Sequence, residues 1–531
     1  MNRDEALRAL DSKELWDLLI IGGGATGLGA AVDAAARGYR TLVLEQHDFA
    51  KGTSSRSTKL VHGGVRYLAQ GNISLVRESL RERSRLLRNA PHLVHRQSFI
   101  VPAYSLWDRP FYGVGLKLYD ALAGEFSLGP SKIVSRGDAL SALPNLQPAK
   151  LHGGIQYFDG QFDDARLALA LAQTVFDLGS VALNYAPVLR LAKEKERVCG
   201  VTARDAESGR EFDLRARVVI NATGVFTDSV RRMDEPGTPP LVTASQGAHI
   251  VVNRSFLPGE SALMVPKTSD GRVLFAIPWH NHAVIGTTDI PVHETPLEPR
   301  PLAQEIEFLL QHTARYLART PAANDILSTF AGLRPLVNPA AARDTARLSR
   351  DHTIIVSQSG LVTIAGGKWT TYRKMAEDVV NKAAPVGGLP VRPCATPQLL
   401  LHGAPADPGI PAAGPGELAG YGSDAASIRA LTRQQTIWSS RLHPRLPYVE
   451  AEVIWSAREE MARTVEDVLA RRTRALFLDA RAAIEMAPRV AELLASELGR
   501  EPAWQRSQVS DFTALAGHYL AIAPPAPSGS G

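Results

Sequence analysis

The chain has 531 residues, which favours two or three domains over a single compact unit. Hydrophobic residues make up 45% and charged residues 21%, so the bulk of the chain is neither disordered nor a coiled coil. The net charge of +5 favours an acidic partner: a phosphorylated metabolite, an anionic membrane or nucleic acid. Two separated cysteines exclude a disulfide framework and a cysteine-rich metal site, and they indicate a reducing compartment.

The N-terminal region shows no targeting or membrane-spanning pattern. Residues 1–16 mix acids and bases without an apolar core, so no signal peptide is expected. The most apolar window, residues 18–32, has five glycines in 15 residues and is too short to cross a bilayer. Any membrane association is therefore expected to be peripheral.

The first organised unit is a strand, a helix and a second strand. Residues 17–21 are an apolar run of strand length, residues 25–37 form a helix of small residues, and residues 40–44 form the next strand. The turn Gly22–Gly27 matches the G-x-G-x-x-G pattern at the position where a helix N-terminus faces a pyrophosphate. Glu45, which ends the second strand, is placed to accept hydrogen bonds from ribose hydroxyls.

Two later turns favour FAD over NAD. A strand over residues 218–221 ends in Ala222, Thr223 and Gly224, a segment of the kind that passes the dinucleotide in two-domain flavoproteins. The turn at Gly366 opens a helix over residues 368–384, whose N-terminus would stabilise negative charge on a reduced flavin.

The remaining chain is read as further strands and helices. Strand-like runs over 181–220 predict a β-meander, and more strands follow within 245–288. Eight prolines within 385–415 indicate a linker or an ordered crossover, and helical periodicity then covers 449–500.

The positive charge is concentrated in one region. Residues 51–120 contain twelve Lys and Arg but four Asp and Glu, an excess of eight that exceeds the net charge of the chain. A predicted helix over 72–90 has an apolar face with Ile73, and its other face carries the arginines of the run Arg77–Arg88. That second face is either simply solvated or docks to acidic phospholipid headgroups.

Several motifs together resemble one family, the FAD-dependent glycerol-3-phosphate dehydrogenases of the aerobic, respiratory type. The most specific are HGGVRYL at 62–68, GLRPL at 332–336 and GGKWTTYR at 366–373. The resemblance implies an α/β fold: a discontinuous Rossmann-like FAD domain of glutathione-reductase type, an antiparallel-sheet substrate domain and an α-helical C-terminal domain. It also implies oxidation of sn-glycerol 3-phosphate to dihydroxyacetone phosphate, with FAD reoxidised by membrane quinone at the inner face of the cytoplasmic membrane.

The domain boundaries follow from these patterns and the resemblance. The oxidoreductase region is expected over 1–385. Its FAD-binding segments are expected near 15–70, 150–240 and 345–385, and its substrate segments near 72–149 and 241–344. A proline-rich linker over 386–415, a helical domain over 416–522 and a disordered tail over 523–531 complete the expected organisation.

The resemblance also implies roles for individual residues. The substrate phosphate needs cations, and Arg66, Arg334 and Arg350 lie in matching motifs. Tyr67 is an expected substrate contact, and Lys368 would bind substrate oxygen or stabilise reduced flavin. His249 is the candidate base or substrate donor, although a histidine in an apolar run also packs in cores. The predicted FAD contacts are Gly22, Gly24, Ala25, Thr26, Gly27, Glu45, Thr53, Ser54, Ser55, Lys59, His62, Gly63, Gly64, Ala222, Thr223, Gly224, Gly366, Gly367, Lys368, Trp369 and Thr370.

Three alternatives remain open at this stage. The first is a glycerol-3-phosphate oxidase that uses oxygen, and the second is an amine or amino-acid oxidase of the same fold. The third is a basic scaffold, which the flavin signals disfavour. No metal site and no nucleic-acid partner are expected, and a homodimer is left open.

Overall fold

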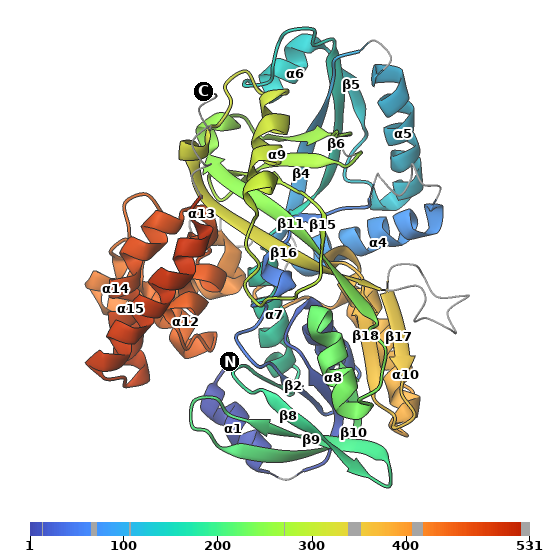
Figure 1. Ribbon diagram of the computed structural model, residues 1–531, viewed down its shortest axis with the longest axis vertical. Coiled ribbons are helices and arrows are strands. Elements are labelled where there is room, and N and C mark those ends of the chain that lie inside the picture. Colours follow the sequence, from blue (N-terminus) through green and yellow to red (C-terminus); the bar gives the residue numbers. More distant parts are fainter. Residues whose placement is uncertain are drawn as a thin grey trace, which may run out of the picture.

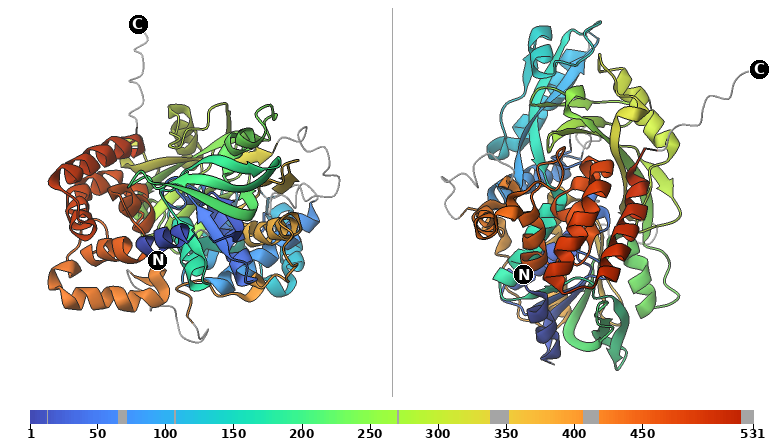
Figure 2. Two further views of the ribbon diagram at one scale, coloured as in Figure 1. Left: turned by 90° about the horizontal axis from the view of Figure 1, so that it is seen from below. Right: turned by 90° about the vertical axis from the view of Figure 1, so that its left-hand side faces the viewer.

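The computed structural model describes residues 1–12, 14–64, 72–105, 108–269, 271–337, 352–405 and 418–521 (Figure 1). It contains two β-sheets, one above the other in Figure 1, and a group of C-terminal helices on one side of both (Figures 1 and 2). The helices are α1 (Arg3–Asp11), α2 (Ala25–Ala36), α4 (Ile73–Asn89), α5 (Asp108–Ala123), α6 (Arg136–Ala142), α7 (Asp164–Asp177), α8 (Thr227–Asp234), α9 (Ala303–Ala314), α10 (Tyr372–Val386), α11 (Ala425–Gln434), α12 (Glu450–Glu459), α13 (Ala475–Leu478), α14 (Ala480–Leu498) and α15 (Pro502–Ala516).

The first sheet has the strand order β17-β18-β10-β1-β2-β7, with β8 and β9 extending β10 as an antiparallel meander. Its central strands run parallel, and β17 alone on this path is antiparallel to its neighbour. The strands are β1 (Trp16–Ile21), β2 (Thr41–Leu44), β7 (Val181–Leu183), β8 (Val188–Glu194), β9 (Arg197–Arg204), β10 (Glu211–Asn221), β17 (His352–Val356) and β18 (Val362–Gly366).

Small residues allow close packing on this sheet. Strand β1 is almost wholly buried, as expected for a strand covered on both faces. Helix α2 packs against α10, and a Cβ on Gly29 would lie 2.7 Å from Cδ2 of Tyr372. The Gly- and Ala-rich sequence of α2 therefore permits a contact that larger side chains would block.

The second sheet has the order β15-β11-β14-β13-β12-β4-β6-β3, and it is largely antiparallel. Strand β16 pairs with β11 through eleven residue pairs, and β5 pairs with β6. The strands are β3 (Leu60–Val61), β4 (Val94–Ala103), β5 (Lys132–Val134), β6 (Gly153–Phe162), β11 (Val242–Asn253), β12 (Ser261–Val265), β13 (Leu274–Trp279), β14 (His282–Gly286), β15 (Ile290–Val292) and β16 (Ile326–Val337).

The C-terminal helices share a hydrophobic core with the second sheet. Leu476 and Phe477 of α13 are buried in the same cluster as Phe99 and Tyr157 of the sheet. A π-helical segment, η11 (Asp467–Arg472), precedes α13 and is itself buried. The C-terminal domain is therefore packed firmly on the oxidoreductase region.

The described part of the proline-rich segment lies along the first domain. Arg392 donates hydrogen bonds to the carbonyls of Arg37 (2.9 Å) and Gly38 (2.7 Å) after α2. The N–H of Leu401 donates to the carbonyl of Asn89 (2.9 Å) at the end of α4. Residues 387–405 are thus bound to two helices rather than extended into solvent.

The expected fold class is confirmed: a Rossmann-like sheet, an antiparallel-rich second sheet and a helical C-terminal domain. Strands β3 and β6 lie in sequence ranges that were expected to bind FAD, but both belong to the second sheet. Strand β6 pairs with β4 on one side and with β3 on the other, and β4 joins them to β12 and the rest of that sheet. Ile73 was expected on the apolar face of its helix but is 48% exposed at the first residue of α4.

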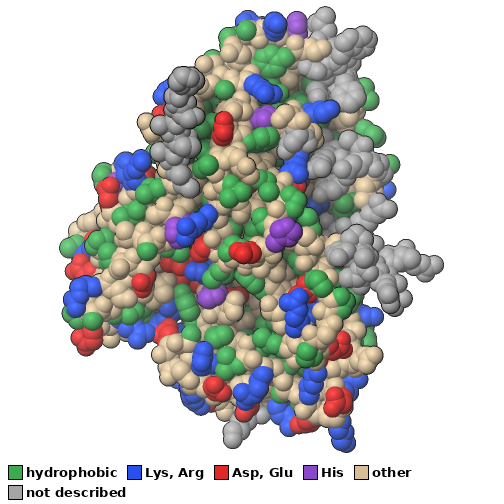
Figure 3. Space-filling view, in the orientation of Figure 1, with side chains coloured by type: hydrophobic (Ala, Val, Ile, Leu, Met, Phe, Trp, Pro, Cys, Tyr) green, Lys and Arg blue, Asp and Glu red, His purple; other side chains and the backbone are tan. Residues whose placement is uncertain are grey.

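The described surface bears mixed charge. Basic and acidic side chains are interspersed over the face shown in Figure 3. Within the described residues, no helix has the length and apolarity needed to span a membrane. The same described residues contain no group of three or more His, Cys, Asp or Glu that could hold a metal ion.

Candidate functional site

A cavity of about 1190 Å³ lies between the two sheets. The carboxyl ends of β1, β2, β10 and β18 border it on one side, and β11 and β16 border it on the other. The predicted site residues that line it are Gly22, Gly24, Ala25, Thr26, Glu45, Thr53, Ser54, His62, Ala222, Thr223, Gly224, His249, Arg334, Gly366, Gly367, Lys368, Trp369 and Thr370. The fold thus collects residues from distant segments at the switch point where dinucleotides bind in α/β sheets.

The glycine turn after β1 leaves no room for side chains. Gly22 has a φ of +111°, and a Cβ there would lie 2.7 Å from the carbonyl oxygen of Ala222. A Cβ on Gly27 would lie 1.9 Å from the carbonyl oxygen of Gly22. Gly27 does not line the cavity, so its role is to let α2 approach the turn. Together they form the tight cradle that a pyrophosphate requires.

Glu45 ends β2 at the cavity and is held by backbone groups. Its Oε2 accepts a hydrogen bond from the N–H of Gly23 (2.7 Å), and its Oε1 accepts one from the N–H of His47 (2.9 Å). Burial raises the pKa of this carboxyl, while the two N–H groups act in the opposite direction. Each oxygen keeps acceptor capacity for ribose hydroxyls.

The segment after β2 forms one wall of the cavity. Ser54 Oγ accepts a hydrogen bond from the N–H of Ala25 (2.9 Å), and its carbonyl accepts one from Trp369 Nε1 (2.9 Å). The N–H of His62 donates to Thr370 Oγ1 (3.2 Å). The segment after β2 and the residues that follow the glycine turn at Gly366 and Gly367 are far apart in sequence, and these hydrogen bonds hold them together.

Lys59 takes a different place from the one expected. Its side chain is fully buried and does not line the cavity; Nζ contacts Asp164 Oδ2 (2.7 Å) and the carbonyl of Ser55 (2.8 Å). Burial lowers the pKa of Lys59 to about 7, although the negative charge of Asp164 acts to raise that pKa. The structure therefore gives Lys59 a buried ion pair rather than a contact with the cavity. Ser55, Gly63 and Gly64 also lie outside the lining.

His249 lies on β11 and lines the cavity. Its ring stacks on Phe330 with centroids 4.6 Å apart, and Nε2 contacts Thr58 Oγ1 (2.9 Å). Burial, reinforced by Lys59 and Arg334, holds the pKa of His249 well below its usual range. The ring is therefore neutral at physiological pH. Within the described residues, nothing hydrogen-bonds its buried Nδ1.

Arg334 reaches the same cavity from β16. Its guanidinium contacts Asp289 Oδ1 (3.1 Å), Thr287 Oγ1 (3.1 Å) and the carbonyl of Thr288 (3.1 Å). A Cβ on Gly247 of β11 would lie 2.4 Å from Nη2, so this glycine makes room for the arginine. The Arg334 side chain is about one-third exposed and lines the cavity, so it is accessible to an anion.

Three predicted substrate contacts fall on residues outside the described ranges: Arg66, Tyr67 and Arg350. The sequence did not point to Thr58 and Phe330, which hold the His249 ring. It also did not point to Gly286 and Gly247, which make room for His249 and Arg334. Thr58 closely follows Thr53, Ser54 and Ser55, hydroxyl-bearing residues that are predicted FAD contacts. No local pattern in the sequence points to Phe330, because the ring that it stacks on, His249, belongs to a different strand.

The cavity fits FAD. Three features line this one space between the two sheets. They are the glycine turn after β1, which suits phosphates, the carboxylate of Glu45 at the end of β2, and the glycine turn at Gly366 and Gly367. The phosphates would lie at Gly22–Thr26 and the ribose at Glu45. His249, Arg334 and Lys368 line the same cavity, and the flavin ring would lie near them.

Comparisons with known proteins agree with this reading. Residues 17–373 match the family described as "FAD dependent oxidoreductase", and residues 362–507 match "C-terminal domain of alpha-glycerophosphate oxidase". The mitochondrial glycerol-3-phosphate dehydrogenase of Mesocricetus auratus is 43% identical over 528 residues, covering 94% of this chain and 72% of that protein. The corresponding Bos taurus protein is 41% identical over 550 residues, covering 98% and 75%.

A solved structure gives the same result. The glycerol-3-phosphate dehydrogenase from Bacillus halodurans complexed with FAD superposes with a TM-score of 0.80 at 29% identity, covering 98% of this chain and 97% of that one. Fold and site thus define an FAD-dependent oxidoreductase of two domains with an added helical domain. The chain belongs to the FAD-dependent glycerol-3-phosphate dehydrogenase family, and FAD is its cofactor.

Proposed function

We propose that the protein oxidises sn-glycerol 3-phosphate to dihydroxyacetone phosphate and passes the electrons to a membrane quinone. The observation that carries the oxidation step is that His249, which is buried and neutral, and Arg334 both line the FAD cavity. Bound FAD supplies a two-electron acceptor for the hydride from the secondary carbinol carbon. His249 accepts the hydroxyl proton, and Arg334 binds the phosphate.

Arg334 is the first residue to test. Arg334→Ala is expected to raise KM for glycerol 3-phosphate about a hundredfold, because a charge-assisted contact to the phosphate dianion is lost. The rate with unphosphorylated glycerol should change little. Steady-state assays with both substrates measure the difference, and an equal loss for both would show that Arg334 does not bind phosphate.

The acceptor is tested on the wild-type enzyme. Anaerobic glycerol 3-phosphate should bleach the flavin in a stopped-flow experiment, and a soluble quinone should restore its absorbance faster than oxygen does. A specific observation favours the second candidate, an oxygen-using oxidase: residues 362–507 match a domain named after alpha-glycerophosphate oxidase. Rapid reoxidation by oxygen with peroxide release would select that alternative.

A surface beside α4 supports peripheral attachment to an anionic membrane. Apolar side chains are exposed on α5 at Val114 (71%) and Leu118 (48%), and on β5 at Ile133 (54%). The neighbouring Lys117 and Lys132 are also exposed. An apolar patch with basic neighbours suits the headgroup boundary of a membrane, such as the inner face of the cytoplasmic membrane, where quinone is available.

Liposome flotation tests this attachment. The double variant Val114→Ser/Leu118→Ser should bind anionic vesicles several-fold more weakly than wild type, while flavin content stays unchanged. Val391→Ser is the matched control, since Val391 is equally exposed (77%) but lies in the proline-rich segment. Equal binding by the wild type and the double variant would remove this surface from the proposal.

A further inference from the structure

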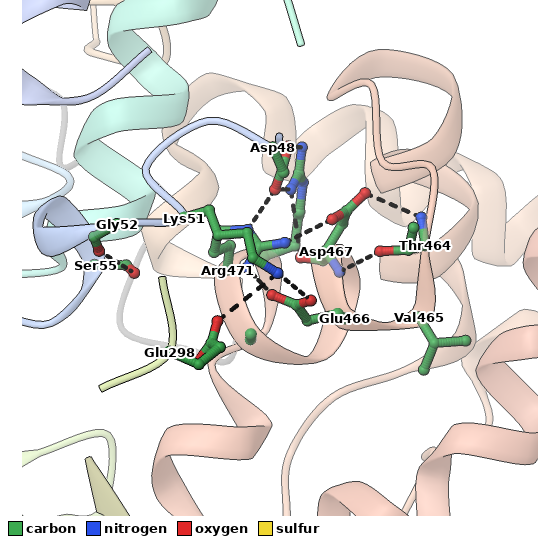
Figure 4. Close-up of polar contacts among 12 residues, drawn as sticks. Asp48, Lys51, Gly52, Ser55, Glu298, Thr464, Val465, Glu466, Asp467 and Arg471 are labelled. Atoms are coloured by element: carbon green, nitrogen blue, oxygen red, sulfur yellow. Dashed lines mark hydrogen bonds and ion pairs between the residues drawn. The ribbon is translucent and has the colours of Figure 1, made fainter. Parts of the chain in front are cut away.

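The C-terminal helical domain contacts the wall of the FAD cavity through ion pairs (Figure 4). Asp48 lies three residues after Glu45 and is fully buried. Its Oδ2 accepts from Arg471 Nε (2.5 Å) and from Arg472 Nη1, and its Oδ1 accepts from Arg472 Nη2 (3.0 Å). Both arginines belong to η11, more than four hundred residues away in sequence.

The acceptors on η11 complete the network. Arg471 Nη1 donates to Glu466 Oε1 (2.7 Å), and its Nη2 donates to Asp467 Oδ1 (2.6 Å). The second oxygen of Glu466 binds Lys51 Nζ (2.6 Å), and Lys51 itself lines the cavity. The opposite charges of the two domains are therefore paired within one buried group.

The same segment is held at two further points. Arg474 Nη2 donates to the carbonyl of Ser55 (2.8 Å), and Arg56 Nη2 contacts the hydroxyl of Tyr519 (3.3 Å). We call residues 46–56 the cavity loop. Its members that line the cavity are Gln46, His47, Ala50, Lys51, Gly52, Thr53, Ser54 and Arg56. The C-terminal domain thus holds the cavity loop at Asp48, Lys51, Ser55 and Arg56.

The network also acts on the predicted ribose ligand. The N–H of His47, in the cavity loop, donates to Glu45. Asp48 raises the pKa of Glu45, and Arg471 lowers it. Arg471 therefore has two effects: it holds the cavity loop in place, and it offsets the effect of the buried Asp48 carboxylate on the pKa of Glu45.

We propose that the C-terminal domain is part of the FAD-binding apparatus, with Arg471, Arg472 and Glu466 as positioning residues that hold the cavity loop in its FAD-binding conformation. A loop fixed before binding loses less conformational entropy when FAD enters, so affinity depends on the domain without any direct contact. Linkage requires the reciprocal effect: FAD binding must also tighten the docking of the C-terminal domain.

The test compares two kinds of buried interdomain ion pair. Arg471→Gln and Glu466→Gln break the network at the cavity loop. Arg166→Gln is the matched control, because Arg166 Nη1 binds Glu460 Oε1 (2.7 Å) across the same domain boundary, with exposures of 8% and 0%, but touches no residue of the cavity loop. For each variant, fluorescence titration of apoprotein gives the FAD Kd, and thermal melting of the same apoprotein gives its stability.

FAD binding should weaken about tenfold or more in both Arg471→Gln and Glu466→Gln. The control Arg166→Gln should lose a similar amount of apoprotein stability, but its Kd for FAD should stay within about twofold of wild type. Arg471→Lys keeps the charge and should recover part of the affinity. If Arg471→Gln fails to fold, Glu466→Gln decides, since Glu466 is partly exposed (17%). Wild-type Kd in the network variants, or an equal loss in Arg166→Gln, would overturn the proposal.

The reciprocal effect is measured independently. Hydrogen exchange of residues 461–479 in wild-type protein should slow when FAD is added to the apoprotein, and this difference should shrink in Glu466→Gln. Exchange that FAD does not alter would contradict the coupling between the cavity loop and the C-terminal domain.

Discussion

At the scale of single residues, Gly286 at the end of β14 controls where the ring of His249 lies. A Cβ on Gly286 would lie 2.1 Å from Cδ2 of His249, so Gly286→Ala must push the ring from its stack on Phe330. With His249 as the proposed base, flavin reduction by glycerol 3-phosphate is expected to slow about a hundredfold, since misplacing a reacting group by about 1 Å has an effect of that size. Stopped-flow bleaching measures the rate.

The control for Gly286→Ala is another glycine substitution. Gly237 is exposed, and a Cβ there meets nothing within 4 Å, so Gly237→Ala should leave the rate unchanged. FAD content should be normal in both variants, because neither residue lines the pyrophosphate cradle. Wild-type reduction by Gly286→Ala would show that the His249 ring does not need its observed position.

At the scale of elements, α4 is attached to α10 by a buried pair. Arg373 donates to Glu82 through Nε (2.7 Å) and Nη2 (2.9 Å), and both side chains are about 95% buried or more. Glu82→Gln leaves Arg373 without an anionic partner at this contact and should destabilise the protein by about 3 kcal/mol. Arg77→Ser, on the exposed face of α4, should cost less than about 0.5 kcal/mol. Thermal melting of the two holoproteins measures the difference in stability. Equal shifts in melting temperature would show that the Glu82–Arg373 pair does not stabilise the contact between α4 and α10.

Local elements were predictable because their signals are local. The unit of β1, α2 and β2 forms as expected, since the buried strand, the glycine turn and the helix of small residues are contiguous. Lys59 is predicted to contact FAD because it follows the hydroxyl-bearing residues Thr53, Ser54 and Ser55. Its partner Asp164 lies 105 residues away, and only the fold brings the two together. The pairing of β6 beside β4 was missed for the same reason.

At the scale of the whole molecule, the site was predictable where a motif carries a role of its own. The glycine turns, Glu45 and Arg334 all reach one cavity, as their motifs indicated. The contribution of the C-terminal domain was not predictable, because Arg471 and Asp48 are ordinary charged residues until the fold buries them against each other. Ion pairs between distant segments leave no pattern of spacing or periodicity in the sequence.

A histidine joins the proline-rich segment to the two parts of the molecule beside it. His402 Nδ1 binds Asp177 Oδ2 (2.7 Å) at the end of α7, and Nε2 binds Asp424 Oδ2 (3.0 Å) in the C-terminal domain. Burial opposes the charged ring, but the bonds to Asp177 and Asp424 outweigh it and raise the pKa of His402 to about 9. The protonated ring therefore ties three segments together at neutral pH.

The stability that His402 contributes must depend on pH. Because its pKa is about 9 in the folded protein and about 6.5 in the unfolded chain, the contribution is complete below about pH 6.5 and disappears as pH rises through about 9. Wild type should exceed His402→Gln by about 1–2 kcal/mol near pH 6, since solvent screens part of the attraction, and the two should converge by about pH 10. Thermal melting across this range measures the gap, with the exposed His293→Gln as control. A gap that stays constant with pH would mean that His402 stabilises the junction by packing rather than by charge.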